Sequence, residues 1–588
     1  MTKMRIAIPV ALISVSGSEA NANAKAACPV LSWRTTAQCW TTRKCSVFLS
    51  FVLAFVAVTT FRSAAQTVLE PGIAQPLKSD PTQMIRQARQ FITSISPSSG
   101  IVGASVTISG SNFGSAQGSS TVTFNGTVAP VTKWTNSSIV ANVPFGHSSE
   151  NVVVTVGGTA SNGINFTVLT RSASPIAANY FGMQCGPGFL PTANNCPNET
   201  GTHTPAWPAS VAQPGLLRLW DSQVSWSYLM TSYGAGVGTY DWQQLDGYLD
   251  DIAAHQPITV NYVFGCVPSF ATSGPSGTTP GSCGNNGSAT PPDDLGMGHG
   301  GSSPTFNQFV TDLLHHCSPA GNCVKTLITG YELWNEANVS TGPGVRWTGT
   351  QLQLYRMVAP AVAIIKANVS NAKIFTPSIT GGGGPWLAGW LSTELSNGPI
   401  SNVYNIHKYL NDKLPEDVIS GISSDLAPNT VSALPWVMGE TGYDNIRLPY
   451  SCNTALYTTA DCIGQMVRWN LLLFSNGASG LYWYYWNTYI GSDPRYATAY
   501  HSMMQYLLGG KFGGPCTSTV VGAATTWTCN FTESGAQTAL WVWTPSETGS
   551  SFTVPSGYVD YRDLTGTKTT VSGGRSITIG PMPIMLEQ

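Results

Sequence analysis

Two glutamates stand where short apolar runs give way to polar and aromatic residues. Glu336 lies in YELWNEAN, residues 331–338, and Glu440 lies in PWVMGETGY, residues 435–443. Two carboxyl groups brought to one place can cleave a glycosidic bond, because one acid protonates the leaving oxygen while a carboxylate acts on the other side of the anomeric carbon. The sequence therefore predicts a pair of catalytic carboxylates, provided that the fold brings the two segments together.

Residues 176–510 alternate between short apolar runs and amphipathic stretches of helical length. Eight strands are expected, at NYFGMQ (179–184), LLRLWDS (216–222), ITVNYVFG (258–265), YELWNEAN (331–338), KIFTPSIT (373–380), VYNIHKYL (403–410), PWVMGETGY (435–443) and GLYWYYWN (480–487). Eight strands with helices between them predict a (β/α)8 TIM barrel. A doubly wound sheet would alternate in the same way, but no glycine-rich phosphate turn follows the first strand.

Polar residues gather at three of the expected strand ends. In such a barrel the chemistry lies at the carboxyl ends of the strands, where side chains converge on the barrel mouth. The fourth strand ends in Asn335-Glu336, the sixth carries His407 and Tyr409, and the seventh ends at Glu440. Strands four and seven lie on opposite sides of an eight-stranded mouth, so the two glutamates are expected to face each other across it.

An Asn-Glu pair at the end of strand four and a Glu at the end of strand seven resemble the signature of the clan A glycoside hydrolases. Within the clan, ELWNEAN (332–338) and GTYDWQQLD (238–246) resemble glycoside hydrolase family 39, and the resemblance covers about residues 177–510. That family includes β-xylosidases, α-iduronidases and bacterial exopolysaccharide hydrolases. One departure is Ala337, where family 39 usually has proline; it leaves the carboxylate in place but weakens the assignment to this family.

The resemblance implies a retaining mechanism in two displacements. Glu440 would be the nucleophile and Glu336 the general acid/base, with carboxyl groups about 5–5.5 Å apart. Their pKa values would have to differ, and a negative Glu440 would raise the pKa of Glu336. The resemblance also implies supporting roles: Asn335 for the sugar 2-hydroxyl, His407 and Tyr409 for orienting the nucleophile, Trp486 as the platform under the sugar, and Arg218 beneath Glu440, where it and His407 would hold the negative charge.

Two charged or titratable residues near the predicted site have a structural alternative. Glu332 points the same way as Glu336 from a regular strand, and pairing with Arg218 inside the barrel is favoured over a part in the chemistry, because buried charges are kept in pairs. His407 taken alone would be an ordinary buried or surface histidine. Its place in the HKY pattern on the sixth strand favours a role in the site.

Aromatic and acidic residues around the strand ends divide between the site and the core. Trp483 differs from Trp486 by three positions, so the two cannot point the same way from a regular strand, and Trp483 is expected to pack. Three other rings could stack on a sugar or pack in the core with equal reason: Trp220, Tyr262 and Trp386. Asp221 and Asp246 are expected to be structural or helix-capping.

Residues 91–169 have an all-β pattern of short alternating runs separated by Gly, Asn and Ser. The stretch ISPSSGIVGASVTISGSNFG, residues 95–114, resembles the start of the IPT/TIG immunoglobulin-like domain, and VTFNG, the region of Trp134 and NFTVL continue the pattern. The resemblance implies a small β-sandwich that acts as a spacer or binding module. Residues 66–90 are expected to be a leader and residues 170–175 a linker. Residues 511–588 are expected to form a second β-sandwich packed on the barrel.

The first 65 residues have the features of an export signal. Arg43 and Lys44 precede an apolar run from Val47 to Phe61, which the small residues Ser63 to Ala65 follow. The run is shorter than the roughly 20 residues of a membrane-spanning helix, so cleavage after Ala65 is expected. The mature protein would then be secreted or periplasmic, with no membrane association.

Cysteine parity agrees with this cleavage. It would remove Cys28, Cys39 and Cys45 from the 13 cysteines and leave ten. The ten are close sequence neighbours, which predicts five short-loop disulfides in an oxidising compartment: Cys185–Cys196, Cys266–Cys283, Cys317–Cys323, Cys452–Cys462 and Cys516–Cys529. Scattered buried thiols are the alternative. Metal ligation is less favoured, because no CxxC motif or histidine cluster accompanies these residues.

The composition limits the classes of partner. Asp, Glu, Lys and Arg make up 10% of the chain, well below the roughly 25% of ordinary soluble domains, and the net charge is −2. Such a chain has no basic surface for nucleic acid, so nucleic-acid binding is set aside. We expect a monomer that needs no cofactor or metal and acts on a plant or microbial polysaccharide or oligosaccharide.

Two other functions use the same fold. One is a carbohydrate-binding or adhesion protein whose barrel has lost its activity, and the intact Glu336, Asn335 and Glu440 argue against it. The other is a transglycosylase, in which an acceptor sugar replaces water. Hydrolysis and transglycosylation need the same residues, so the sequence does not separate them.

Overall fold

The computed structural model describes residues 89–100, 103–144, 150–168, 174–184, 214–275, 287–296, 301–342, 344–429, 434–443, 452–484, 490, 493–521 and 524–588. The predicted signal region and nearly all of the predicted leader lie outside the described residues. Trp486, Cys185, Cys196 and Cys283 lie outside them as well. No helix in the described ranges is both long enough and apolar enough to cross a membrane.

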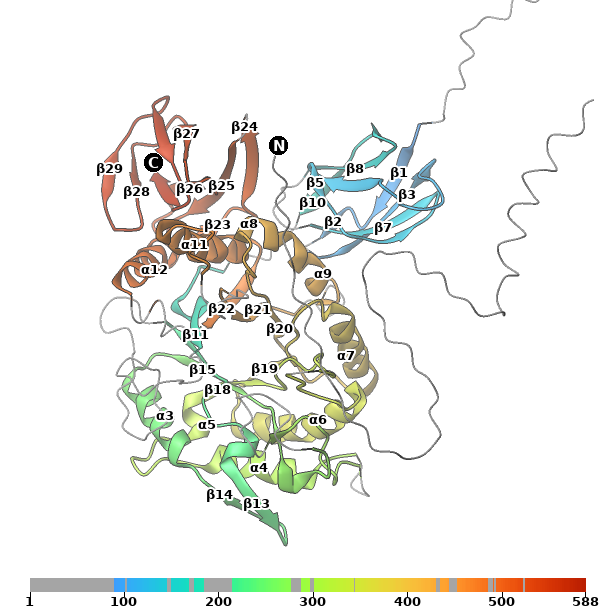
Figure 1. Ribbon diagram of the computed structural model, residues 1–588, viewed down its shortest axis with the longest axis vertical. Coiled ribbons are helices and arrows are strands. Elements are labelled where there is room, and N and C mark those ends of the chain that lie inside the picture. The colour runs from blue at the N-terminus through green and yellow to red at the C-terminus, as the bar shows by residue number, and fades with distance from the viewer. Residues whose placement is uncertain are drawn as a thin grey trace, which may run out of the picture. The chain divides into compact units, whose positions relative to one another are not determined.

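Residues 91–168 form an immunoglobulin-like sandwich of two sheets (Figure 1). The first sheet has the order β1 (Phe91–Ser96), β3 (Ser105–Ser111), β7 (Ser138–Asn142), β6 (Val131–Trp134). The second has the order β2 (Ser99–Gly100), β10 (Ile164–Val168), β8 (Glu150–Val156), β4 (Thr121–Phe124), β5 (Thr127–Val128), with β9 (Thr159–Ala160) on β8. In β3, Val106 and Ile108 are buried while Ser105 and Thr107 are exposed, because alternate residues of a strand face opposite ways.

Eight parallel strands form the TIM barrel, and they are the eight that the sequence predicts, in the same order. They are β11 (Phe181–Gln184), β12 (Leu216–Leu219), β15 (Thr259–Val263), β18 (Ile328–Glu332), β19 (Lys373–Phe375), β20 (Tyr404–His407), β21 (Trp436–Thr441) and β22 (Ala478–Tyr484). A parallel bridge between Phe375 and Val403 joins the ends of the row, where β19 meets β20. Strand β18 is shorter than predicted and ends at Glu332, so Glu336 lies in the loop that follows it.

Helices surround the strands and bury their apolar faces against them (Figure 1). They are η1 (Ala178–Tyr180), α2 (Trp226–Leu229), α3 (Gln243–Ala254), η2 (Ser269–Ala271), α4 (Pro304–His315), α5 (Val324–Leu327), α6 (Gln351–Asn368), α7 (Gly384–Asn397), α8 (Pro415–Val418), η4 (Ile419–Gly421), α9 (Ile422–Leu426), α11 (Thr459–Ser475) and α12 (Pro494–Leu507). Local sequence sets where they begin. Thr350 and Gln353 form a capping box at the start of α6, and the Ser303 hydroxyl caps α4, whose first residue is Pro304.

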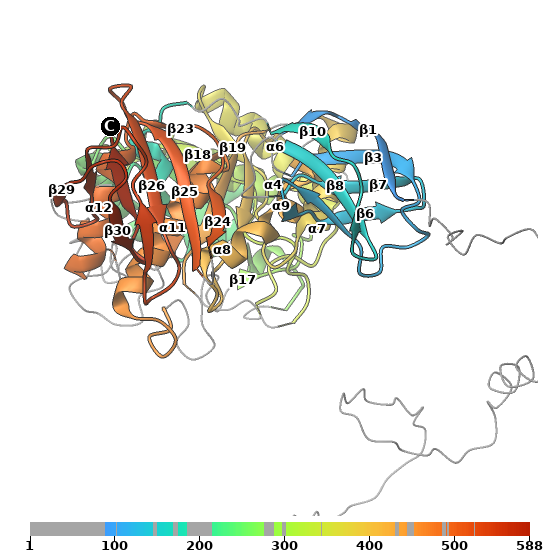
Figure 2. The ribbon, with the colours of Figure 1, turned by 90° about the horizontal axis from the view of Figure 1, so that it is seen from above.

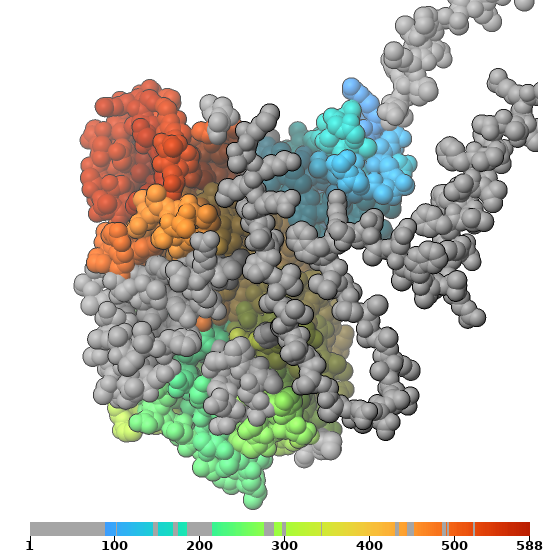
Figure 3. Space-filling view, viewed as in Figure 1, coloured from blue at the N-terminus to red at the C-terminus, as the bar shows by residue number. Residues whose placement is uncertain are grey.

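Two small sheets lie in the loops of the barrel. Strands β16 (Val267–Pro268) and β17 (Gly287–Ser288) pair in the loop after β15. Strands β13 (Met230–Gly234) and β14 (Val237–Tyr240) form a hairpin between β12 and α3. The hairpin projects from the barrel as the green tip at the lower end of Figure 3, and Val237 near its turn is 68% exposed.

The C-terminal residues form two sheets, as predicted. One has the order β23 (Lys511–Phe512), β25 (Ala524–Thr532), β26 (Thr538–Trp543), β31 (Ile584–Glu587), β28 (Asp560–Arg562), β29 (Lys568–Thr570), with β24 (Thr517–Val521) on β25; the other pairs β27 (Ser550–Thr553) with β30 (Ser576–Ile579). Figure 2 shows β24, β25 and β26 side by side. In β26, Trp541 and Trp543 belong to the core of the barrel, whereas Leu540 and Val542 belong to a separate core. Alternate side chains of this strand point to opposite faces of the sheet, so one face packs on the barrel and the other packs on the sheet of β27 and β30.

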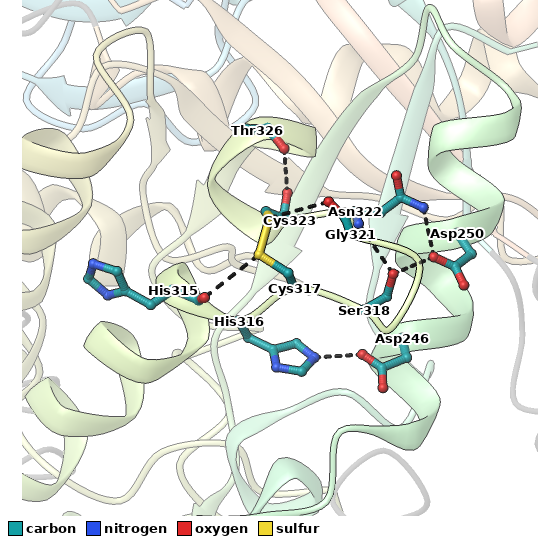
Figure 4. The surroundings of a disulfide bond; sticks show 10 residues. All are labelled: Asp246, Asp250, His315, His316, Cys317, Ser318, Gly321, Asn322, Cys323 and Thr326. Carbon is teal, nitrogen blue, oxygen red and sulfur yellow. Dashed lines mark hydrogen bonds and ion pairs between the residues drawn. A yellow bond between two sulfur atoms is a disulfide. The ribbon is translucent and has the colours of Figure 1, made fainter.

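Three of the five predicted cysteine pairs are disulfides within the described residues: Cys317–Cys323, Cys452–Cys462 and Cys516–Cys529. Cys266 is disulfide-bonded as well, and its predicted partner and the first pair lie outside the described residues. Figure 4 shows what surrounds the first bond. Asp246 of α3 pairs with His316 at 2.6 Å, and Asp250 accepts a hydrogen bond from Asn322 at 2.7 Å. Asp246 was expected to be structural or helix-capping, and in the structure it links α3 to the turn after α4.

Candidate active site

The two glutamates predicted to act together do meet at the carboxyl ends of the barrel strands. Glu440 lies near the end of β21, and Glu336 follows β18 by four residues. One carboxylate oxygen from each and a ring nitrogen of His407 lie within 4.8 Å of one another. The side chains of Glu336 and Glu440 are 14% and 9% exposed, so both carboxylates are largely removed from water but still reachable.

The backbone at Glu336 is held in an uncommon conformation. Its φ of 45° lies in the left-handed region, which a residue with a side chain adopts only when its surroundings require it. Those surroundings come from the end of strand five, because the Glu336 N–H donates to the Ser378 hydroxyl at 2.9 Å and the Ala337 N–H donates to the Ser378 carbonyl at 3.1 Å. Ser378 therefore fixes the direction in which the Glu336 side chain leaves the loop.

Arg218 on β12 is the centre of a buried hydrogen-bond network. Its Nε and Nη2 donate to the two oxygens of Glu332 at 2.9 and 2.8 Å, which confirms the predicted pairing. Nη1 donates to Gln184 at 2.6 Å and to Glu440 at 2.7 Å, and Nη2 donates to Asn335 at 2.7 Å. Burial alone would lower the pKa of Arg218, but Glu332 and Glu440 outweigh it, so the pKa is raised and the guanidinium stays charged.

Glu440 receives donors from two strands and from the segment just after a third. Its Oε2 accepts from Arg218 of β12 at 2.7 Å and from Gln184 of β11 at 3.1 Å. Its Oε1 accepts from the hydroxyl of Tyr409, just beyond β20. Burial and the neighbouring Glu440 raise the pKa of Tyr409 well above its usual value, so the phenol keeps its proton and remains a donor. The expected orienting role of Tyr409 thus has a direct contact behind it.

Glu336 has a different environment. Burial raises the pKa of its carboxyl group, while the charges of Arg346 and Arg218 and a hydrogen bond with Thr380 act in the opposite direction. The direction is the one expected for an acid, but burial is its main cause rather than the charge of Glu440. Arg346 Nε lies 3.8 Å from Oε2 of this carboxylate, and His407 Nδ1 lies 3.2 Å from Oε1.

His407 differs from its expected role as a holder of negative charge on Glu440. Burial lowers its pKa to about 4, so the ring is neutral near pH 7. Its closest carboxylate is Glu336 at 3.2 Å, whereas Glu440 lies at 4.0 Å. A neutral imidazole can accept a hydrogen bond from protonated Glu336 or donate a hydrogen bond to ionised Glu336. His407 is therefore better placed to support the proposed acid, Glu336, than the proposed nucleophile, Glu440.

The other predicted aromatic and acidic residues pack or form hydrogen bonds within the protein. Trp220 is only 4% exposed and lies beneath the Arg346 guanidinium, 5.9 Å from ring centre to Cζ. Tyr262 is fully buried and donates to the Val224 carbonyl. Trp386 stacks on Trp390. Trp483 is buried in the barrel core, as expected. Asp221, for which a structural or capping role was expected, accepts from the Tyr484 hydroxyl at 2.6 Å.

Three residues of the site were missed by sequence reasoning. Gln184 and Ser378 lie at or just after the ends of strands one and five, so the same strand-end rule that found Glu440 could have found them. Arg346 lies ten positions beyond Glu336 in a loop, and no spacing in the sequence marks it.

Glu336, His407 and Glu440 also provide three donors close enough to hold a metal ion. However, the Arg218 guanidinium already binds Oε2 of Glu440 at 2.7 Å, and a metal ion there would meet this fixed positive charge. The donor set therefore fits proton and glycosyl transfer better than it fits a cation.

Comparison with known proteins identifies the N-terminal module. Residues 91–168 match the family model of the IPT/TIG domain, as the sequence suggests. No curated protein matches the chain.

Several solved structures resemble the chain weakly. A glucosidase from Croceicoccus marinus is 11% identical, with 71% of this chain and 97% of that chain covered and a TM-score of 0.46. A GH39 enzyme from Xanthomonas axonopodis pv. citri is 15% identical, with 71% and 95% covered and a TM-score of 0.45. CelM2, a bifunctional glucanase-xylanase from a metagenome library, is 13% identical, with 71% and 96% covered and a TM-score of 0.43. Similarities at this level do not assign an activity, which has to be argued from the site.

Proposed function

We propose that the chain is a retaining glycoside hydrolase in which Glu440 is the nucleophile and Glu336 the general acid/base. The observation that carries the proposal is the meeting of their carboxylate oxygens and His407 within 4.8 Å. Carboxyl groups of inverting enzymes stand about 6.5–9.5 Å apart to admit a water molecule, whereas those of retaining enzymes stand about 5–5.5 Å apart. One oxygen of each carboxylate lies within 4.8 Å of the other, which supports a close, retaining arrangement and direct attack by one carboxylate.

The unequal environments support the division of roles. Burial raises the pKa of Glu336, which favours a protonated acid when substrate arrives. Glu440 instead accepts hydrogen bonds from Arg218, Gln184 and Tyr409, which stabilise a carboxylate. Oε1 has one of these donors and Oε2 has two, so we assign the attack to Oε1.

The reaction would then run in two steps. Glu440 Oε1 attacks the anomeric carbon while Glu336 gives its proton to the leaving oxygen, and a glycosyl ester of Glu440 forms. Glu336, now ionised, takes a proton from water, and the resulting hydroxide displaces Glu440 and restores the first anomeric configuration. Asn335, whose Oδ1 is fixed by Arg218, would offer its amide N–H groups to the sugar 2-hydroxyl.

The remaining features fit an exported enzyme of polysaccharide breakdown. Disulfides persist in oxidising compartments, so we place the mature chain outside the cytoplasm. In this proposal residues 1–65 are the cleaved signal and residues 91–169 the IPT/TIG module. Residues 176–510 are the catalytic barrel and residues 511–588 the sandwich that supports it. The IPT/TIG module would act as a spacer or binding module.

Product analysis on a panel of polysaccharides and oligosaccharides tests the proposal. Wild type is compared with E440Q and with E547Q, a matched substitution of an exposed glutamate in the C-terminal sandwich. We expect wild type and E547Q to release a first product with the configuration of the cleaved bond, seen by proton NMR before mutarotation. Inversion in the first product would contradict the retaining mechanism, and equal turnover by E440Q would contradict the role of Glu440.

A further inference from the structure

Arg346 is a cation at the candidate site, and two of its three guanidinium nitrogens are buried without a hydrogen-bond partner among the described residues. An arginine side chain carries five N–H donors. Arg218 makes five hydrogen bonds, to Glu332, Gln184, Glu440 and Asn335. Within the described residues, Nε and Nη1 of Arg346 are buried and have no hydrogen-bond partner. The structure thus holds one saturated arginine under the nucleophile and one unsaturated arginine beside the acid.

The backbone of Arg346 is fixed while its charged group is not. The Arg346 N–H donates to the Val339 carbonyl at 2.7 Å, and its carbonyl accepts from the Trp334 indole at 2.9 Å. The guanidinium lies over the Trp220 ring at 5.9 Å, and its closest carboxylate oxygen is Glu336 Oε2 at 3.8 Å, too long for a hydrogen bond. The side chain is 15% exposed, and Nη2 is not among its buried, unpartnered atoms, so a ligand can approach the guanidinium from the Nη2 side. Packing on Trp220 thus positions the guanidinium, and no described residue accepts a hydrogen bond from its Nε or Nη1.

Among the described residues, no carboxylate hydrogen-bonds to Arg346. Glu332 and Glu440 both bond directly to Arg218, and His407 is neutral because its pKa is lowered to about 4. When Glu336 is protonated, as the proposed first step requires, the charge of Arg346 offsets the second of these two carboxylates only from a distance, and its buried Nε and Nη1 groups still have no acceptor. A buried donor without an acceptor costs stability, and an anionic ligand would supply that acceptor.

We propose that Arg346 binds a carboxylate or sulfate on the sugar that leaves with the proton of Glu336, so that the substrate is an acidic polysaccharide or oligosaccharide. This rests on the proposed function. Arg346 Nε lies 3.8 Å from Glu336 Oε2, beside the carboxyl group that would protonate the leaving oxygen, so the anion that it binds would belong to the sugar that leaves. An anion there would also offset the lowering of the Glu336 pKa by Arg346 and so favour the protonated acid.

The test compares matched disaccharides of a linkage that wild type cleaves. The leaving sugar carries a C6 hydroxyl, a C6 carboxylate or a C6 sulfate, and a further set carries the carboxylate on the other sugar. We expect kcat/KM for a leaving sugar with an acid to exceed that of the neutral partner at least tenfold. The comparison of carboxylate with sulfate then shows which anion the site takes.

Arginine variants show whether Arg346 is responsible. R346Q is expected to reduce the ratio of acidic to neutral kcat/KM at least tenfold, R346K to keep part of it, and R356Q, a matched change on the exposed side of α6, to keep all of it. An equal ratio in wild type and R346Q would overturn the proposal. A preference seen only when the carboxylate is on the sugar that does not leave would overturn it as well.

A binding measurement separates this inference from the proposed function. Saturation-transfer NMR with glucuronic acid, glucose 6-sulfate and glucose is run on E440Q and on E440Q/R346Q, with thermal melting to confirm that both are folded. Binding of an acidic sugar that is lost with R346Q supports the anion site even if no disaccharide is cleaved, in which case only the proposed hydrolysis fails. Equal binding by both proteins overturns the anion site even if hydrolysis is observed.

Discussion

The ends of strands four and seven each present a glutamate to the same space, but they do so by different means. Glu440 lies within its strand and accepts donors from Arg218, Gln184 and Tyr409. Glu336 lies in a loop with a φ of 45°, close to a neutral histidine and 3.8 Å from Arg346. The comparison teaches that neighbours alone can give one residue type two different environments, which the proposed mechanism uses for two different roles. Donors stabilise a carboxylate at one end, and burial favours a protonated acid at the other.

The largest expected effect is the loss of the strand-seven carboxylate. E440Q removes the proposed attacking oxygen, and we expect kcat to fall by on the order of 10⁶-fold, as it does when the nucleophilic serine of a protease is removed. The loss should be similar for substrates with good and poor leaving groups, because no variant group replaces the nucleophile. Steady-state kinetics with a pair of aryl glycosides measures it. A loss below about tenfold would remove Glu440 from the chemistry.

The strand-four carboxylate should behave differently in the same assay. E336Q removes general acid/base catalysis, which is worth about 10²–10⁴-fold. We expect the first step to be nearly normal for a good leaving group that needs no proton, with turnover then limited by the second step. Added azide, a nucleophile that needs no general base, should restore turnover in E336Q and yield a glycosyl azide of retained configuration. If E336Q and E440Q responded alike, the division of roles would be wrong.

Disruption of the network under Glu440 should affect stability as well as activity. R218Q leaves Glu332 buried without its cation, and removal of one partner of a buried ion pair costs about 3–5 kcal/mol. We expect the free energy of unfolding in urea to fall by that amount. R346Q, at the other glutamate, should change it much less, because its nearest carboxylate is 3.8 Å away and part of the side chain is exposed. Equal losses would contradict the contrast between the two arginines.

A single donor to the nucleophile should matter less than the whole network. Y409F removes the hydrogen bond to Glu440 Oε1, and a bond to a charged group is worth about 1.5–3 kcal/mol. We therefore expect kcat/KM to fall by roughly tenfold to hundredfold. Y355F removes a hydroxyl that bonds the Asn397 and Gly398 carbonyls at the far end of α7, and it serves as the matched control. Equal activity of Y409F and Y355F would contradict the orienting role of Tyr409.

The smallest expected effect is a shift in pH dependence at the strand-four end. The proposed acid must be protonated, so activity is lost as pH rises through the Glu336 pKa. Arg346 lowers that pKa against the rise caused by burial. R346Q should therefore move the basic limb of kcat/KM on a neutral substrate to higher pH. A limb that stays in place, or moves down, would show that Arg346 does not act on Glu336.

Much of the fold could be predicted because it depends on short-range patterns. The eight barrel strands were recognisable as apolar runs, and the alternation in β3 and β26 marked strands with two different faces. The caps of α6 and α4, Thr350 and Ser303, are local features of the same kind, although the structure was needed to identify them. The exact end of β18 was not predictable, because the chain leaves the sheet after Glu332 through contacts with Ser378 from another part of the chain.

In the candidate site too, local patterns predicted some residues, and tertiary contacts alone placed the others. Residue types and strand positions singled out Glu336, Glu440 and Tyr409, and the family resemblance implied the place of Arg218. The Arg218–Glu332 pair followed from the rule that buried charges need partners. His407 was expected beside Glu440, and its Nδ1 lies 4.0 Å from Glu440 but 3.2 Å from Glu336, since the sequence shows which strand carries a ring but not which carboxylate its nitrogen meets first. Arg346 could not be found at all, because a loop side chain is placed by packing on Trp220 and not by periodicity.

The sequence by itself thus determined the barrel, the order of its strands and the two glutamates at its mouth, because hydrophobic periodicity and strand ends are local properties of the chain. Only the tertiary structure decided how these glutamates differ. The charge state of a carboxyl group depends on burial and on donors within a few ångströms, and Gln184, Arg218, Tyr409 and Arg346 come to those positions from separate segments. The same holds for the unused donors of Arg346, which the fold alone brings beside the acid.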